Sequence, residues 1–242
     1  PAYAVAELAC PAEAADRITL DKVTATPIDG GIRVEAEGVS AHGSTPEQGE
    51  NAIGRLALAL TQLPLEGELA ECMAFLADRI GLETRGESLG LAMRDDLSGD
   101  LTVNLGVAAF ADDTLSLTLS VRYPVTKTYD EAHPRLERAF SLGGFQETQM
   151  KHKAAIYMPP ESELIRKLSK VYEEQTGEKA VLKSIGGGTY ARKLPGRAVA
   201  FGMEFPGQPA TAHMADEYMD VKELVLNAKI IAHAIYALAT EN

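Results

Sequence analysis

The chain has 242 residues, of which 45% are hydrophobic and only 6% aromatic, so it can form one large or two small domains with an aliphatic core. Its formal net charge of −12 argues against nucleic-acid binding, because the phosphates would be repelled. Two cysteines cannot form a disulfide framework, and neither a secretory signal nor a membrane-length apolar run is recognised, so we expect a soluble cytoplasmic protein.

The first part of the chain predicts strand pairs separated by helices. Alternation of apolar and polar residues, with turn residues between the members of each pair, indicates strands at residues 18–28, 32–39, 101–107, 115–121 and 145–156. Apolar residues at helical spacing indicate helices at residues 51–62, 66–80 and 130–140. This order predicts an α+β domain over residues 1–156, with an antiparallel sheet that has helices on one face.

The order of the predicted elements changes after Pro159-Pro160, where helices and short strands begin to alternate. Helices are expected at residues 161–176 and 221–239, and short strands at residues 180–184 and 198–202. Such alternation is typical of a mostly parallel sheet, so residues 157–242 are predicted to be an α/β segment.

Three polar segments follow predicted strands. A lone loop histidine such as His42 most often has no function, and the three glycines at residues 186–188 are more often an ordinary turn than an anion-binding loop. The spacing of these glycines fits neither a Walker loop nor a dinucleotide fingerprint. His213, with Asp216 and Glu217 nearby, could be a metal ligand with supporting carboxylates.

Four segments together carry a family resemblance. They are Ser40-Ala41-His42-Gly43-Ser44-x-Pro46-x-x-Gly49-x-Asn51-Ala52, Leu119-Ser120-Val121-Arg122-Tyr123-Pro124, Gly186-Gly187-Gly188-Thr189-Tyr190-Ala191-Arg192, and Ala212-His213-x-x-Asp216-Glu217. In this order they resemble the PepV-type dipeptidases (Xaa-His dipeptidases and carnosinases) of the zinc metallopeptidase clan that includes aminoacylases and zinc carboxypeptidases. The resemblance implies that residues 1–156 form a substrate-capping lid. Residues 157–242 would be the C-terminal part of a zinc-exopeptidase catalytic domain.

The resemblance also implies a role for each site residue. His42 would stabilise the negative charge of the tetrahedral intermediate, and Arg122 would grip the C-terminal carboxylate of a dipeptide or short peptide. The other substrate-binding residues would be Gly187, Gly188, Thr189 and Arg192. His213 would be a zinc ligand.

The resemblance further implies two zinc ions whose ligands come mainly from an N-terminal half with a His-x-Asp motif and a Glu-Glu pair. No histidine of this chain is followed by x-Asp, and a catalytic zinc site needs about three protein ligands. We therefore expect the chain alone to be inactive and to bind zinc at most weakly. We also expect residues 157–242 either to be less stable than the lid or to be covered by a second copy of the chain, which would make it a homo-oligomer.

A second interpretation remains open. The chain could be a non-catalytic dimerisation or small-carboxylate-binding module derived from such an enzyme. The sequence upstream of Pro1 would discriminate between the two, because the family's metal-binding motifs precede the lid.

Overall fold

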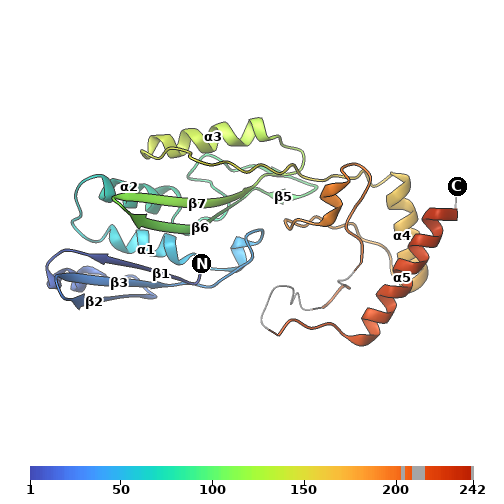
Figure 1. Cartoon of the computed structure of the whole chain (residues 1–242), viewed down its shortest axis with the longest axis horizontal. Helices are drawn as coiled ribbons and strands as arrows, with labels where there is room; N and C mark the ends of the chain where they lie inside the picture. Colours follow the sequence, from blue (N-terminus) through green and yellow to red (C-terminus); the bar gives the residue numbers. More distant parts are fainter. Residues whose placement is uncertain (203–204, 209–215, 241–242) are drawn as a thin grey trace. The chain divides into compact units, whose positions relative to one another are not determined.

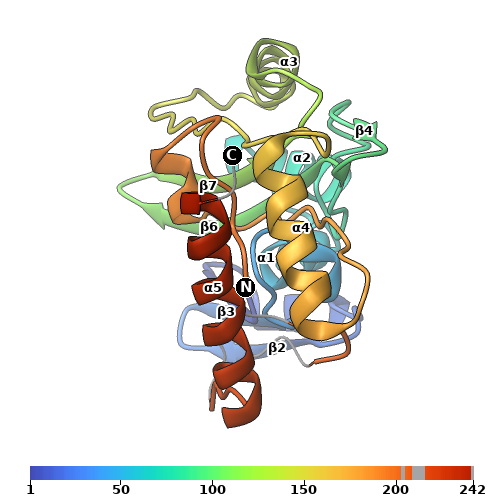
Figure 2. The same cartoon turned by 90° about the vertical axis from the view of Figure 1, so that its right-hand side faces the viewer.

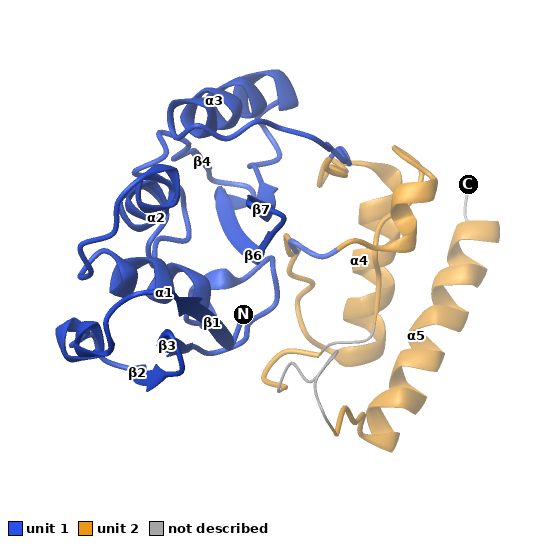
Figure 3. Ribbon diagram, turned by 60° about the vertical axis from the view of Figure 1, so that its left-hand side comes forward, with its two compact units in different colours: residues 1–154, 185–187 blue, residues 155–184, 188–242 orange. Residues whose placement is uncertain are grey.

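The computed structural model describes residues 1–202, 205–208 and 216–240. The chain forms two compact units, shown in Figure 3: Pro1–Ala154 with Ile185–Gly187, and Ala155–Ser184 with Gly188–Asn242. We call them the first and the second unit. The assignment of residues 1–156 and 157–242 to a lid and a catalytic-domain segment stays a prediction.

A three-stranded antiparallel sheet begins the first unit (Figure 1). Its strands, in the spatial order β1-β3-β2, are β1 (Tyr3–Leu8), β2 (Val23–Ile28) and β3 (Gly31–Glu37). The predicted hairpin is confirmed, with Ile28 paired to Gly31 and a left-handed Gly30 in the turn. Its first strand starts at Val23, later than expected, because a turn at residues 21–22, in which Lys22 has a positive φ, precedes it. The 3₁₀ helix η1 (Ala12–Arg17) and β1 were not anticipated.

Two helices pack with this sheet around the main core. α1 (Ala52–Leu60) and α2 (Glu68–Arg79) match the predicted helices. The fully buried Ile32, Val34 and Ala36 of β3 belong to the same core as the apolar faces of both helices. Gly54 of α1 lets the end of α2 approach closely, since a Cβ there would lie 1.7 Å from the carbonyl oxygen of Gly81.

The second predicted strand pair is also confirmed, as β6 (Thr102–Ala111) and β7 (Thr114–Arg122). Asp112 and Asp113 both have positive φ in the connecting turn, as a two-residue hairpin turn of type I′ requires. The short strands β4 (Arg94–Asp95) and β5 (Gly99–Asp100) form a separate hairpin. The expected single antiparallel sheet is therefore wrong in the described residues, where three separate small sheets occur.

α3 (Tyr129–Leu142) begins with a capping box formed by Thr128 and Glu131, and it confirms the third predicted helix. The strand expected at residues 145–156 is wrong, because this segment contains no hydrogen-bonded strand. Its residues 146–155 are exposed, so the segment buries no face that would stabilise a strand.

The second unit is built on two helices. α4 (Glu163–Thr176) and α5 (Val221–Thr240) pack together (Figure 2). Leu168 and Val171 of α4 form one buried cluster with Ile230, Ala234 and Ala237 of α5. The strands expected at residues 180–184 and 198–202 are wrong. A strand requires a hydrogen-bonded neighbour, and neither segment pairs with any of the described residues. The 3₁₀ helix η3 (Tyr190–Lys193) follows the glycine run.

α5 also corrects the expectation that no segment reaches membrane length. It has 20 residues, and an 18-residue window within it has a mean hydropathy of 1.2, which by length and composition alone is enough to cross a membrane. The core helix of a soluble protein can meet the same criterion, and one face of α5 packs against α4. The helix is therefore weak evidence for a membrane span.

Together, helices and small antiparallel sheets make the chain an α+β protein. This confirms the fold class that was predicted for the first part of the chain. The parallel sheet expected in the second part is not observed in the described residues.

Candidate functional site

The loop that carries His42 is closed tightly at its base. We call residues 40–49 the His42 loop; it contains the 3₁₀ helix η2 (Pro46–Gln48) and connects β3 to α1. Val39 and Glu50 form an antiparallel bridge across its base, with two N–H···O bonds of 2.9 Å. Only glycine fits beside this bridge, since a Cβ on Gly38 would lie 2.3 Å from the carbonyl oxygen of Glu50, and one on Gly49 would lie 2.5 Å from that of Val39.

Within the loop, Ser44 holds the His42 imidazole by the Nδ1 atom. The Ser44 amide donates to Nδ1 at 3.3 Å, and the Ser44 hydroxyl lies 2.6 Å from the same atom. A ring nitrogen that accepts from a backbone amide carries a lone pair, so this contact favours the tautomer of a neutral His42 that has its proton on Nε2. This arrangement makes Nε2–H the hydrogen-bond donor of the ring.

The structure brings the His42 loop next to the end of β7. A Cβ built on Gly43 would lie 3.8 Å from Nη2 of Arg122, 3.7 Å from Nδ2 of Asn104 and 4.0 Å from Oγ of Ser120. Asn104 of β6 is the register partner of Ser120 of β7, so both project from the same face of the strand pair. The site therefore gathers a guanidinium, an amide and a hydroxyl beside the loop, all of which can donate to an anion.

Arg122 was predicted as a site residue from the sequence, whereas Asn104 and Ser120 were not. The signal was present in the alternation of both strands. Val103 and Leu105 are buried on one face of β6, which assigns Asn104 to the polar face shared with Arg122.

The segment that follows Arg122 is fixed by Asp95 of β4. Oδ2 of Asp95 accepts hydrogen bonds from the Thr126 amide and hydroxyl at 3.0 and 2.9 Å, and the Val125 amide donates to the Ser98 hydroxyl at 2.8 Å. Partial burial opposes ionisation of Asp95, but hydrogen bonds from the backbone and side chains of Thr126 and Ser98 outweigh it and hold the pKa of this carboxyl well below its usual range. The β4–β5 hairpin thus tethers the chain three to four residues beyond Arg122.

The glycine run divides between the two units. Gly186 belongs to the first unit and touches the His42 loop, since a Cβ there would lie 2.3 Å from Cβ of Ser44. Gly187 borders open space.

The remaining predicted site residues do not lie in the first unit. Gly188, Thr189 and Arg192 lie in the second unit, where the Arg192 guanidinium carbon would be 3.8 Å from a Cβ on Gly188. His213 lies outside the described residues. The substrate-binding and metal-binding roles of all these residues stay predictions.

The described residues do not fit the zinc centre that the resemblance implies. In the part of the chain that the structure describes, no three His, Cys, Asp or Glu side chains are grouped so that they could hold a metal ion. What the described site offers is a set of hydrogen-bond donors, which suits a carboxylate or a developing oxyanion.

Comparison with known proteins adds a family match that covers most of the chain. Residues 12–237 match the family described as Peptidase family M20/M25/M40. The chain is 37% identical over 226 residues to a Bacillus subtilis protein named "Putative dipeptidase YtjP", a match that covers 92% of this chain and 48% of the relative. It is 32% identical over 216 residues to a Staphylococcus aureus protein named "Putative dipeptidase SAUSA300_1697", which covers 88% of this chain and 46% of the relative. The chain thus spans about half the length of the curated relatives it matches.

Proposed function

Since this chain belongs to peptidase family M20/M25/M40, we propose that it forms the substrate-binding part of a metal-dependent dipeptidase of the PepV type. The observation that carries this proposal is the placement of the His42 loop beside Arg122, Asn104 and Ser120. The names of its relatives, which describe dipeptidases, support the substrate class. In this proposal residues 1–156 are the lid and residues 157–242 the C-terminal part of the catalytic domain of a cytoplasmic enzyme.

Arg122 binds the free C-terminal carboxylate of the substrate in this proposal. A guanidinium donates two parallel hydrogen bonds to a carboxylate, and Asn104 and Ser120 add neutral donors within reach of the same region. A clamp on the terminal carboxylate leaves no space for a longer chain on that side of the scissile bond. The substrates are therefore dipeptides or short peptides.

His42 supplies a hydrogen bond to the oxyanion of the tetrahedral intermediate. In this proposal Ser44 holds Nδ1, and the neutral ring donates to the oxyanion through Nε2–H. The donor is preorganised, because the bridge between Val39 and Glu50 closes the loop before substrate arrives.

Zinc is part of this proposal only because the sequence resembles that of the PepV-type zinc dipeptidases. His213 would be the one ligand supplied by this chain, and the other ligands would lie in the part of the relatives that the chain does not span. The described residues assemble no site for zinc. The 242-residue chain alone is accordingly proposed to be inactive and to bind zinc weakly.

The test compares dipeptides that have a free C-terminus with the corresponding amides, using the complete protein that contains this chain. Arg122→Ala should lower kcat/KM for the free acid by roughly 10- to 100-fold, since a hydrogen bond to a charged group contributes about 1.5–3 kcal/mol. The amide should lose much less, so that the two substrates become nearly equivalent. The matched control is Arg94→Ala in β4, whose arginine is exposed and pairs with Asp100.

An unchanged preference for the free acid in Arg122→Ala would reject the proposed carboxylate clamp. Arg122-dependent binding of dipeptides without hydrolysis would instead favour the alternative, a non-catalytic carboxylate-binding module.

A further inference from the structure

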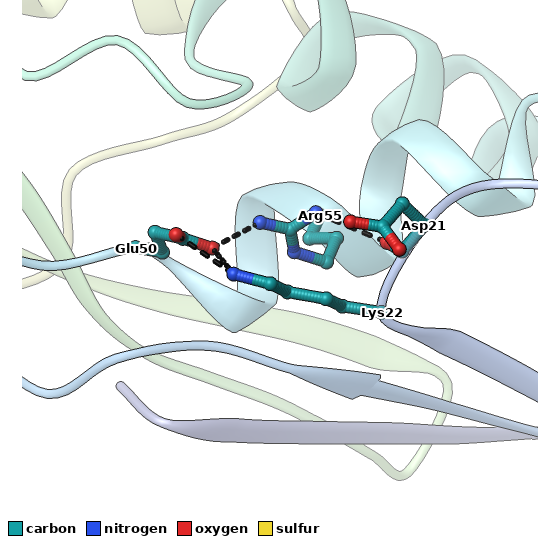
Figure 4. A network of polar contacts seen from close by, with 4 residues as sticks. All are labelled: Asp21, Lys22, Glu50 and Arg55. Carbon is teal, nitrogen blue, oxygen red and sulfur yellow. Dashed lines mark hydrogen bonds and ion pairs between the residues drawn. The ribbon is translucent and has the colours of Figure 1, made fainter.

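A charged network holds the base of the His42 loop (Figure 4). Nζ of Lys22 donates to the two carboxylate oxygens of Glu50 at 2.8 and 2.7 Å, and Nη2 of Arg55 donates to Oε2 of Glu50 at 2.5 Å. Nη1 of Arg55 donates to the carbonyl oxygen of Asp21 at 3.0 Å. We call this group the base anchor; it joins the exit of the loop to α1 and to the start of β2.

Arg55 makes Glu50 indispensable to this network. Its residue exposure is only 7%, and a buried charge requires a paired counter-charge. Glu50 supplies the carboxylate, and its own backbone forms the bridge to Val39 that closes the loop.

Asn51, the residue after Glu50, links the base anchor to the β6–β7 strand pair that carries Arg122. Oδ1 of Asn51 caps α1 by accepting from the amides of Ile53 and Gly54. Its Nδ2 donates at 2.8 Å to the carbonyl oxygen of Leu105 in β6, the strand that pairs with β7. Asn51 therefore ties the exit of the His42 loop to β6, the strand that pairs with the strand carrying Arg122.

We propose that Glu50 is a positioning residue, which acts through the base anchor to keep His42 in the tautomer that Ser44 selects. This inference rests on the proposed function of His42 as an oxyanion donor. If the bridge opens, Ser44 and His42 shift relative to each other, and the ring loses the hydrogen bonds that place its proton on Nε2. A purely structural Glu50 would affect global stability and leave this tautomer unchanged.

The first measurement uses the 242-residue chain and does not depend on catalysis. Imidazole ¹⁵N shifts should show one dominant Nε2–H tautomer of His42 in the wild type at neutral pH, and a mixture of tautomers in Glu50→Gln. Exchange of the Val39 and Glu50 amides should accelerate about tenfold or more, as expected when a local opening becomes easier. The matched control is Glu35→Gln, which removes a half-buried carboxylate beside Arg33 in β3 and should change neither quantity.

A second variant keeps the proposal testable if Glu50→Gln does not fold because Arg55 is left without its carboxylate. Lys22→Met removes only the exposed arm of the anchor and should move both quantities in the same direction by less. Wild-type tautomer populations and wild-type exchange in whichever of these variants folds would overturn the proposal.

Kinetics of the complete protein separate this inference from the proposed function. Glu50→Gln should lower kcat while KM for a dipeptide stays near its wild-type value, because Arg122 is untouched. If His42→Ala retains full activity, the proposed function fails, whereas the tautomer shift in Glu50→Gln would still show that the anchor positions the ring. If His42→Ala is impaired but Glu50→Gln shows wild-type kcat and tautomer, only the positioning role is wrong.

Discussion

At the scale of single residues, His42 is the side chain whose removal should be most informative. In the complete protein, His42→Ala should lower kcat by roughly 10²- to 10³-fold, the usual effect of losing one oxyanion donor. Its zinc content should stay unchanged, because no grouping of potential metal ligands includes His42 among the described residues. Kinetics combined with metal analysis check both parts. Loss of zinc would show that His42 is a ligand and that its assigned role is wrong.

Asp95 predicts how the tether behind Arg122 responds to acid. Its pKa is lowered in the folded chain, so its contribution to stability is present above the ordinary carboxyl value of about 4 and is lost as the pH falls toward the folded value. Asp95→Asn removes this contribution. Urea unfolding between about pH 3 and pH 6 should show a shallower loss of stability on acidification in Asp95→Asn than in the wild type. Parallel curves of unfolding free energy against pH for the two proteins would mean that ionisation of Asp95 does not contribute to stability.

At the scale of elements, Asn51 illustrates how one side chain serves a helix and a strand together. Asn51→Ala removes the cap of α1 and the hydrogen bond to Leu105, so unfolding free energy should fall by about 1–3 kcal/mol. Ser162→Ala, which removes the cap of α4 alone, is the matched control and should cost about 1 kcal/mol. Equal losses in the two variants would show that the bond to β6 contributes nothing.

The helices and hairpins that were predicted correctly are marked by local patterns in the sequence. The apolar stripe of α1 and the turn residues Asp112 and Asp113 act locally, so helices and hairpins could be located within a few residues. The strands expected at residues 145–156, 180–184 and 198–202 failed because strand formation depends on distant partners, which local alternation does not specify.

The site was predictable only where a motif marked it. The His42 motif and Arg122 were identified from the sequence, and the structure places Gly43 beside Arg122. Asn104 and Ser120 were missed because the pairing of β6 with β7, which makes them neighbours, arises from the fold. Their importance could have been suspected only by combining strand register with the buried face of each strand.

At the scale of the whole molecule, the two units differ in how much core they bury. The first unit encloses a large aliphatic cluster that spans sheets and helices. Among the described residues of the second unit, the buried core cluster comprises Leu168, Val171, Ile230, Ala234 and Ala237. α5 also exposes large apolar side chains, with Val221 at 73% and Ile235 at 64%. A small core beside an exposed apolar helix face is typical of a segment that is completed by another partner.

We therefore expect the second unit to be less stable than the first and to be covered by another copy of the chain as concentration rises. Hydrogen exchange at low protein concentration should show markedly weaker protection after residue 157, because opening this unit exposes less apolar surface. Light scattering should show self-association at higher concentration, and protection of α5 should rise with it. Ile235→Lys places a charge on the exposed face of α5 and should shift association to higher concentration.

The matched control for this last prediction is Leu142→Lys, which changes an 81% exposed leucine at the end of α3 in the first unit. It should leave association unchanged if contact occurs through α5. An equal effect of the two variants would mean that association follows net charge, which both substitutions shift from −12 in the same direction. A strictly monomeric chain with equal protection in both units would show that the second unit is stable by itself. The exposed face of α5 would then need no partner.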